Sequence, residues 1–186
     1  MSKGEKQMKK ILVVIDMQND FITGALPADG GIEIVPRIIE KIKSGNYDRI
    51  VCTYDTHYPE NYEETIEGKN IPLHCFYKTV GWDLNSDISS TVAEYTDDIQ
   101  FIPKESFGSY GALPAGVIPL YPEFDDFEIE LCGVCTDICV ISNALILRAA
   151  FPNTRIVVDS NCCAGTTKEA HEAALKVMKN CLIEVI

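Results

Sequence analysis

The chain has 186 residues, 46% of them hydrophobic, and a formal net charge of −12. A surface that follows nucleic-acid phosphates needs clustered Lys and Arg, so this acidic balance argues against a nucleic-acid partner and favours a small molecule. No stretch approaches the roughly 18 to 20 continuous apolar residues that cross a bilayer, which excludes a membrane-spanning protein. We expect one soluble, cytoplasmic domain over residues 1–186, with no signal peptide.

Continuous apolar runs recur along the chain and predict strands that are buried on both faces. The runs cover 11–15, 49–53, 129–133, 155–158 and 182–186, with 99–103 as a weaker sixth candidate. Apolar residues at helical spacing predict helices over 32–44, 137–150 and 168–180. This alternation predicts an α/β fold, a three-layer αβα sandwich with a mostly parallel central sheet of about six strands. In such a sheet the ligand site lies beyond the carboxyl ends of the strands.

One long segment, 57–98, has no clear periodicity and is rich in Pro, Gly, Asn and charged residues. We interpret it as an active-site excursion over the edge of the sheet and not as a second domain.

Asp16 directly follows the first predicted strand. A carboxylate at the carboxyl end of a strand could serve as a general acid and base. The alternative is a turn in which Asp16 bonds only its own backbone.

Two histidines lie within the excursion beside several carboxylates. Asp55 and His57 follow the second strand two residues apart, so their side chains point the same way in an extended segment. Together with Glu67 and His74 they indicate a divalent-metal site of histidine and carboxylate type. The alternative is a solvated acidic loop with surface histidines. The third histidine, His171, is interpreted as a surface or helix-packing residue.

Cys139 lies in the segment 133–140, which follows a buried strand and opens a helix, with Thr136 as the predicted N-cap. Free backbone N–H groups and the positive end of the helix dipole would there lower the pKa of the thiol. Cys139 could equally be a small buried side chain.

The chain contains eight cysteines, and in a chain with a full apolar core we expect them to stay reduced. The spacing of Cys132, Cys135 and Cys139 also admits a redox or metal-binding cluster, which Cys162 and Cys163 could join.

The motifs occur in the same order as in the nicotinamidase/isochorismatase-like cysteine hydrolases, which the chain resembles from Lys10 to Leu182. They are an Asp-x-Gln-Asn-Asp-Phe at 16–21, an Asp-x-His at 55–57, a Pro-x-His-Cys at 72–75, an isolated Lys104, and a Gly-Val-x-Thr-Asp-x-Cys-Val at 133–140. The resemblance implies an isochorismatase-like fold and a triad of Asp16, Lys104 and Cys139. It further implies a cis peptide between Val134 and Cys135, and an oxyanion hole made by the backbone N–H groups of Cys135 and Cys139.

The resemblance also implies a metal bound by Asp55, His57, Glu67 and His74, with zinc as the first choice and iron or manganese as alternatives. Relatives often have a second His shortly after the Asp-x-His, where this chain has none, so Glu63 or Glu64 could replace Glu67. Position 135 is Cys where a small residue such as Ala is common. Isochorismatases that cleave vinyl ethers lack the nucleophilic cysteine, so its presence argues against that reaction.

From this resemblance we expect hydrolysis of a small amide through a thioester on Cys139, with nicotinamide as the first candidate substrate. A flat pocket would be lined by Phe21, Trp82, Phe107 and Tyr110. The alternatives are a related enzyme for carbamoyl or ureido compounds, a redox or metal-binding protein built on the cysteines, and a non-catalytic binding module. Relatives often form dimers or tetramers, so a homo-oligomer is expected.

Overall fold

The computed structural model describes residues 8–118 and 127–186 and contains one central sheet. The strands are β1 (Lys9–Ile15), β2 (Arg49–Asp55), β3 (Ile99–Lys104), β4 (Phe127–Val134), β5 (Arg155–Ala164) and β6 (Glu184–Val185). They lie in the order β3-β2-β1-β4-β5-β6, and every neighbouring pair is parallel. The predicted α/β fold is confirmed, including the strand expected at 99–103.

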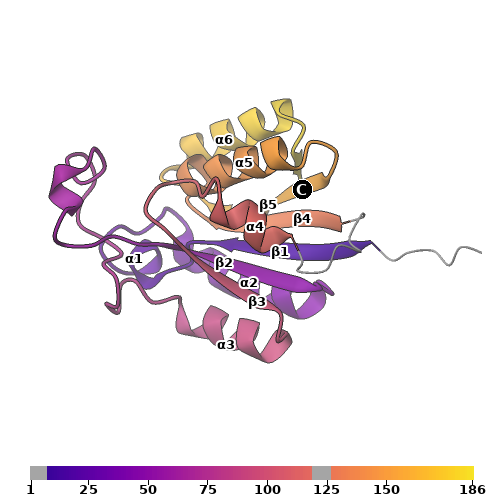
Figure 1. Cartoon of the computed structure of the whole chain (residues 1–186), viewed down its shortest axis with the longest axis horizontal. Coiled ribbons are helices and arrows are strands. Elements are labelled where there is room, and N and C mark those ends of the chain that lie inside the picture. Colours follow the sequence, from indigo (N-terminus) through magenta and orange to yellow (C-terminus); the bar gives the residue numbers. More distant parts are fainter. Residues whose placement is uncertain (1–7, 119–126) are drawn as a thin grey trace, which may run out of the picture.

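Helices cover both faces of this sheet (Figure 1). They are α1 (Asn19–Ile22), α2 (Gly31–Ser44), α3 (Ser86–Tyr95), α4 (Ala112–Val117), α5 (Ile141–Ala150) and α6 (Lys168–Asn180). Helices α2 and α3 lie on one face, and α4, α5 and α6 lie on the other. Within the described residues, no helix combines the length and the apolar character needed to cross a membrane.

Strand β1 shows why the apolar runs have no polar alternation. Ile11, Val13 and Ile15 belong to one apolar cluster, whereas Leu12 and Val14 belong to the other. Successive side chains of a strand point to opposite faces, so a strand covered on both sides must be apolar at every position. The predicted single domain of 1–186 also includes 1–7 and 119–126, which lie outside the described residues.

The excursion contains more regular structure than its sequence suggested, because α3 lies within 57–98. Its N-cap is Asn85, whose side chain accepts hydrogen bonds from the backbone N–H groups of Asp87 and Ile88. The helix buries only Ile88, Thr91 and Val92, so its apolar stripe is short and the 3.6-residue periodicity is faint.

The predicted cap at Thr136 was wrong. A π-helical turn, Thr136–Val140, precedes α5, and Cys135 takes its N-cap position without a capping side chain. The Thr136 hydroxyl oxygen instead lies 2.8 Å from Nδ1 of His171 on α6. His171 therefore packs α6 against this turn, in agreement with its interpretation as a helix-packing residue.

Candidate active site

Four neighbouring strands end at the same edge of the sheet, and each delivers a side chain to it. Asp16 follows β1, Asp55 ends β2, Lys104 ends β3, and Cys139 lies in the turn after β4. Asp55 and Lys104 are also direct partners in the β2–β3 register. All four side chains are buried. The parallel order of the strands therefore brings together residues that are far apart in the sequence.

Lys104 lies at the centre of this group and contacts the other three. Its Nζ is 2.7 Å from Asp16 Oδ2, 3.2 Å from Asp55 Oδ1 and 3.5 Å from Cys139 Sγ. Lys104 thus joins Asp16 to Cys139, and the charge of Asp16 raises the pKa of the thiol.

The charges in this group follow from burial and mutual attraction. Burial raises the pKa of Asp16, and although Lys104 opposes this shift the net direction is upward. Burial alone would lower the pKa of Lys104, but Asp16, Cys139 and Asp55 outweigh it and raise that pKa well above its usual value. Lys104 is therefore an ammonium group at neutral pH. A buried carboxyl with a raised pKa can both accept and return a proton near neutrality.

The expected low pKa of Cys139 was wrong for the resting protein. Burial raises the pKa of this thiol, Lys104 lowers it in part, and the negative charges of Asp16 and Asp55 raise it again. The nearby ammonium is shared with two carboxylates, so its field does not offset the desolvation of a thiolate. Cys139 rests as a thiol, and its activation requires a base.

Two side chains that sequence reasoning did not select hold the acidic residues in place. The Thr53 hydroxyl donates to Asp16 Oδ1 at 2.6 Å, and its oxygen accepts from the Asp16 N–H at 3.2 Å. Gln18 donates to the Asp55 carbonyl at 2.8 Å and accepts from the Asp55 N–H at 2.7 Å. Thr53 precedes Asp55 by two residues on the same strand, and this spacing could have identified it.

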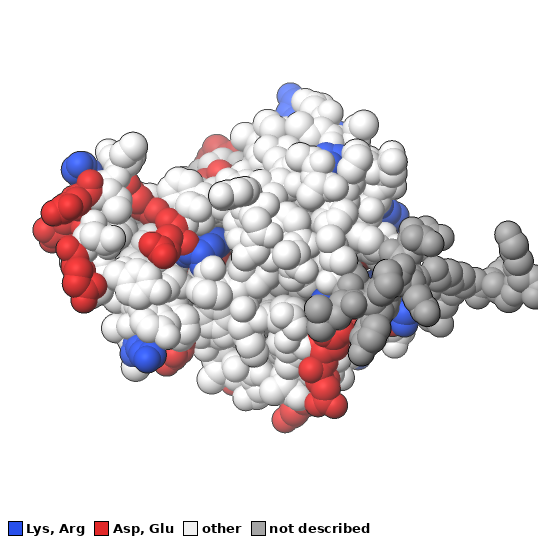
Figure 2. Space-filling model, in the orientation of Figure 1, with Lys and Arg blue, Asp and Glu red and all other residues white. Residues whose placement is uncertain are grey.

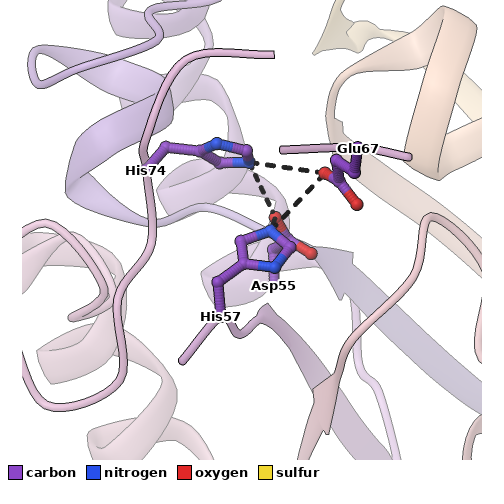
Figure 3. A group of neighbouring side chains, drawn as sticks. All are labelled: Asp55, His57, Glu67 and His74. Carbon is purple, nitrogen blue, oxygen red and sulfur yellow. Dashed lines mark hydrogen bonds and ion pairs between the residues drawn. The ribbon is translucent and has the colours of Figure 1, made fainter. Parts of the chain in front are cut away.

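Figure 3 shows the second group, formed by Asp55, His57, Glu67 and His74. Each residue offers one donor atom, and these atoms lie within 4.8 Å of one another. Nε2 of His57 and Nε2 of His74 each lie 3.0 Å from Asp55 Oδ2. Two imidazoles and two carboxylates converging on one point form a donor set suited to a divalent transition metal.

Two details of this group fit a metal ion. Glu67 Oε1 is buried without a hydrogen bond within the described residues, and its nearest neighbours are Nε2 of His57 at 3.5 Å and Nε2 of His74 at 3.7 Å. His74 Nδ1 lies 2.7 Å from the Pro72 carbonyl, a contact that orients the ring with its Nε2 towards Asp55 and Glu67. Glu63 and Glu64 are exposed, so the geometry selects Glu67.

The protonation of this group shows strong internal attraction. Burial opposes ionisation of Asp55, but Lys104 and hydrogen bonds from His57 and His74 outweigh it and hold the pKa of Asp55 below its usual value. Burial would lower the pKa of His57, yet Asp55 and Glu67 raise it to about 9. A proton on His57 thus occupies the position that a metal cation would take.

A cavity of about 350 Å³ connects the two groups. Cys139 lines it together with Asp55, Glu67 and His74, and its apolar walls include Phe21 and Phe107. The structure does not bring Trp82 and Tyr110 to this cavity, which corrects their expected place in the pocket. Trp82 lines a different cavity, and Tyr110 is 87% exposed. Their loops carry no periodicity from which the direction of a side chain could be read.

The backbone beside Cys139 agrees with the resemblance, because the peptide between Val134 and Cys135 is cis. Asn143 is buried one helical turn after Cys139 and was not selected from the sequence. Its side-chain amide donates to the carbonyls of Cys139 and Phe107 and accepts from the N–H of Ser109. Asn143 thus joins the Cys139 turn to the loop that carries Phe107.

The remaining cysteines form no disulfide, and all eight are free thiols. In the described part of the chain, the one group of candidate metal ligands contains no cysteine. Burial raises the pKa values of Cys132, Cys162 and Cys163, which disfavours their thiolate forms, and among the described residues no ammonium group like that of Lys104 is paired with them. These observations disfavour the cysteine-cluster alternative.

Comparisons with known proteins agree with this geometry. The isochorismatase domain model matches residues 10–186. The chain is 28% identical to a nicotinamidase of Schizosaccharomyces pombe, over 94% of this chain and 91% of the relative. Its structure matches a nicotinamidase/pyrazinamidase of Bacillus subtilis with a TM-score of 0.82 at 27% identity, covering 96% and 99% of the two chains. It also matches a pyrazinamidase of Pyrococcus horikoshii, solved in complex with zinc, with a TM-score of 0.76 at 27% identity, covering 96% and 98%.

Proposed function

The chain belongs to the isochorismatase family, and from this premise we propose that it is a cysteine amidohydrolase that converts nicotinamide and water into nicotinate and ammonia. One observation carries the proposal: Cys139 contacts Lys104, which is paired with Asp16, and it lines the same cavity as Asp55, Glu67 and His74 of the candidate metal group. The similarity to nicotinamidases over nearly the whole chain supports the substrate.

The reaction begins with the transfer of a proton. Asp16 takes the proton of the Cys139 thiol while the sulfur attacks the amide carbonyl carbon, which splits one difficult hydrolysis into two easier steps. Lys104 stays charged throughout. Its ammonium group stabilises the negative charge, which moves from Asp16 to the sulfur and then to the carbonyl oxygen. The backbone N–H groups of Cys135 and Cys139 are the proposed donors to this oxyanion.

The leaving group departs with the same proton. Asp16 returns it to the amide nitrogen, the carbon–nitrogen bond breaks, and ammonia leaves a thioester on Cys139. Asp16, again a carboxylate, then takes a proton from water as the water oxygen attacks the thioester carbonyl. Collapse of this second intermediate breaks the carbon–sulfur bond, and the proton on Asp16 returns to the sulfur. The raised pKa of Asp16 suits these repeated transfers.

We propose zinc as the metal, held by Asp55, His57, Glu67 and His74, since the Pyrococcus horikoshii pyrazinamidase is in complex with zinc. A zinc ion in such a site acts as a Lewis acid that can bind a ring nitrogen or lower the pKa of a bound water. Asp55 links this site to the reaction, because its Oδ2 faces the histidines while its Oδ1 contacts Lys104. The homo-oligomer and the cytoplasmic location stay predictions.

The cavity walls favour an aromatic acyl group over a carbamoyl or ureido substrate. Phe21, Phe107 and Ile71 surround the space beside Cys139 with apolar surface, which suits a flat ring. A small ureido compound would leave this apolar surface uncovered.

Ammonia release from nicotinamide tests the proposal directly. The protein would be loaded separately with zinc, iron or manganese and compared with Cys139→Ala and with Cys181→Ala, which removes a half-buried thiol outside the cavity. We expect activity in the wild type and in Cys181→Ala, and none in Cys139→Ala. If no metal-loaded form releases ammonia from nicotinamide but one releases it from ureido amides, the proposed substrate is wrong.

A further inference from the structure

A second cavity is lined by residues of β2, β3, α3 and the excursion. Its volume is about 540 Å³, and it shares no lining residue with the cavity beside Cys139. Aromatic side chains dominate its wall, which consists of Tyr54, Tyr58, Tyr77, Trp82, Phe101, Asp83, Leu84, Ser89 and Pro103. Nothing in the proposed hydrolysis uses these residues.

Two pairs of these rings meet nearly edge to face instead of stacking in parallel. Tyr77 and Trp82 meet at 82° with centroids 5.2 Å apart, and Tyr54 and Phe101 meet at 74° with centroids 5.8 Å apart. Tyr54 and Trp82 join these two pairs, with centroids 5.0 Å apart and a smaller interplanar angle of 39°. Ring faces at steep angles around one space can surround a compact group from several sides. Because the face of an aromatic ring carries negative potential, such a space attracts a cation.

The polar groups of the wall also favour a positively charged ligand. Asp83 and Ser89 are exposed residues of this wall, and within the described residues no ion pair joins the Asp83 carboxylate to a basic side chain. No Lys or Arg lines the cavity. Figure 2 shows acidic side chains gathered on the lobe at the left, with basic side chains beside them. Asp83 is the charged residue of the wall itself.

One ring of this wall already interacts with a cation. Lys78 Nζ lies over the ring of Tyr77, 5.0 Å from its centroid. Trp82 is fixed in the wall, because its indole N–H donates to the Thr56 hydroxyl at 2.9 Å and its carbonyl accepts from Gln18 at 2.8 Å. Trp82 is thus held in place before a ligand binds, which reduces the conformational entropy lost on binding.

We propose that this aromatic cavity is an accessory site for an organic cation, of the quaternary ammonium class. The methyl groups of such a cation would contact the faces of Tyr54, Tyr77 and Trp82, and Asp83 would supply the opposite charge. An alkylated ammonium fits better than Na⁺ or K⁺, because it loses little hydration among apolar walls. The site is separate from the amide cavity, so the proposal does not depend on the proposed function.

The test compares choline with 3,3-dimethyl-1-butanol, in which carbon replaces the charged nitrogen. Trp82 is the single tryptophan of the chain, so its fluorescence reports on the cavity directly. Choline chloride would be titrated against sodium chloride at matched ionic strength, with saturation-transfer NMR of the methyl signal as a second readout. We expect choline to bind about tenfold more tightly than the uncharged probe.

Matched variants locate the binding. Asp83→Asn should weaken choline binding about two- to fivefold, whereas Asp87→Asn, the same change on an exposed residue outside the cavity, should leave it unchanged. Tyr77→Leu should weaken it about fivefold, whereas Tyr110→Leu should have no effect.

Three outcomes would overturn the proposal. They are equal binding of the two probes, absence of binding by both readouts, and choline affinity that neither Asp83→Asn nor Tyr77→Leu reduces. If sedimentation instead shows a dimer that Phe101→Ser dissociates, this surface joins two copies of the chain and the proposal is also overturned.

Discussion

Replacing Lys104 by Met removes one positive charge from between two buried carboxylates and changes the side-chain volume little. Lys104 Nζ lies 2.7 Å from Asp16 Oδ2 and 3.2 Å from Asp55 Oδ1. Asp55 keeps the imidazoles of His57 and His74, but Asp16 keeps only the Thr53 hydroxyl as a partner. Breaking a buried pair while leaving one charge behind costs about 3–5 kcal/mol, and we expect a fall of this size in the free energy of unfolding at neutral pH.

The loss should depend on pH with a definite sign. Burial already raises the pKa of Asp16 with Lys104 present, and the substitution raises it further. Between the unfolded pKa of about 3.9 and the raised native pKa, the native state binds more protons than the unfolded state. Stability therefore falls as pH rises through this window, by up to about 1.4 kcal/mol per pH unit. The deficit of Lys104→Met should shrink as the pH is lowered towards 4.

Urea unfolding of the chelator-treated protein measures these values without a contribution from bound metal. Adding Asp16→Asn to Lys104→Met removes the uncompensated charge, and Asn can still accept the hydrogen bond from Thr53. We expect the double variant to be more stable than Lys104→Met by about 1–3 kcal/mol. A loss below about 1 kcal/mol in Lys104→Met, or no recovery in the double variant, would refute this reasoning about buried charge.

Other predictions concern the metal group and the proton acceptor. Glu67→Gln should lower zinc affinity at least roughly tenfold, measured in competition with a chromogenic chelator, whereas Glu64→Gln should not change it. Equal effects of the two substitutions would show that Glu67 is not a zinc ligand. Since Asp55 and Glu67 raise the pKa of His57 to about 9 against the effect of burial, zinc must displace a proton. Apparent zinc affinity should therefore rise up to about tenfold per pH unit until that pKa, with proton release visible by calorimetry in two buffers; a flat profile would contradict it. Thr53→Val removes a hydrogen bond that stabilises the Asp16 carboxylate, which raises the pKa of Asp16. The acid limb of the pH profile of kcat/KM should therefore move to higher pH, and kcat/KM at neutral pH should fall roughly 10- to 100-fold. If the acid limb of the profile stays at the wild-type pH, Thr53 has a structural role only.

The sheet could be predicted because its strands are covered on both faces. The predicted run at 49–53 became β2 (Arg49–Asp55) and the run at 129–133 became β4 (Phe127–Val134). The observed strands extend further because backbone pairing continues through polar residues such as Asp55, which apolar patterning does not mark. Helix α3 was missed because only one narrow stripe of it is buried.

The site could be predicted where the fold itself sets the geometry. Residues that follow neighbouring parallel strands must meet at one edge, so Asp16, Asp55, Lys104 and Cys139 converge. The excursion has no such constraint, and Trp82, assigned to the substrate pocket, faces another cavity. Spacing also says nothing of desolvation, which is why the pKa of Cys139 was predicted in the wrong direction.

Trapping the thioester tests the central claim most directly. Metal-loaded protein in excess over nicotinamide would be quenched with acid during a single turnover, and its peptides would be analysed by mass spectrometry. We predict a nicotinoyl group on the peptide that contains Cys139, removable by hydroxylamine, and neither adduct nor ammonia from Cys139→Ala. Ammonia release by Cys139→Ala at the wild-type rate would contradict the account.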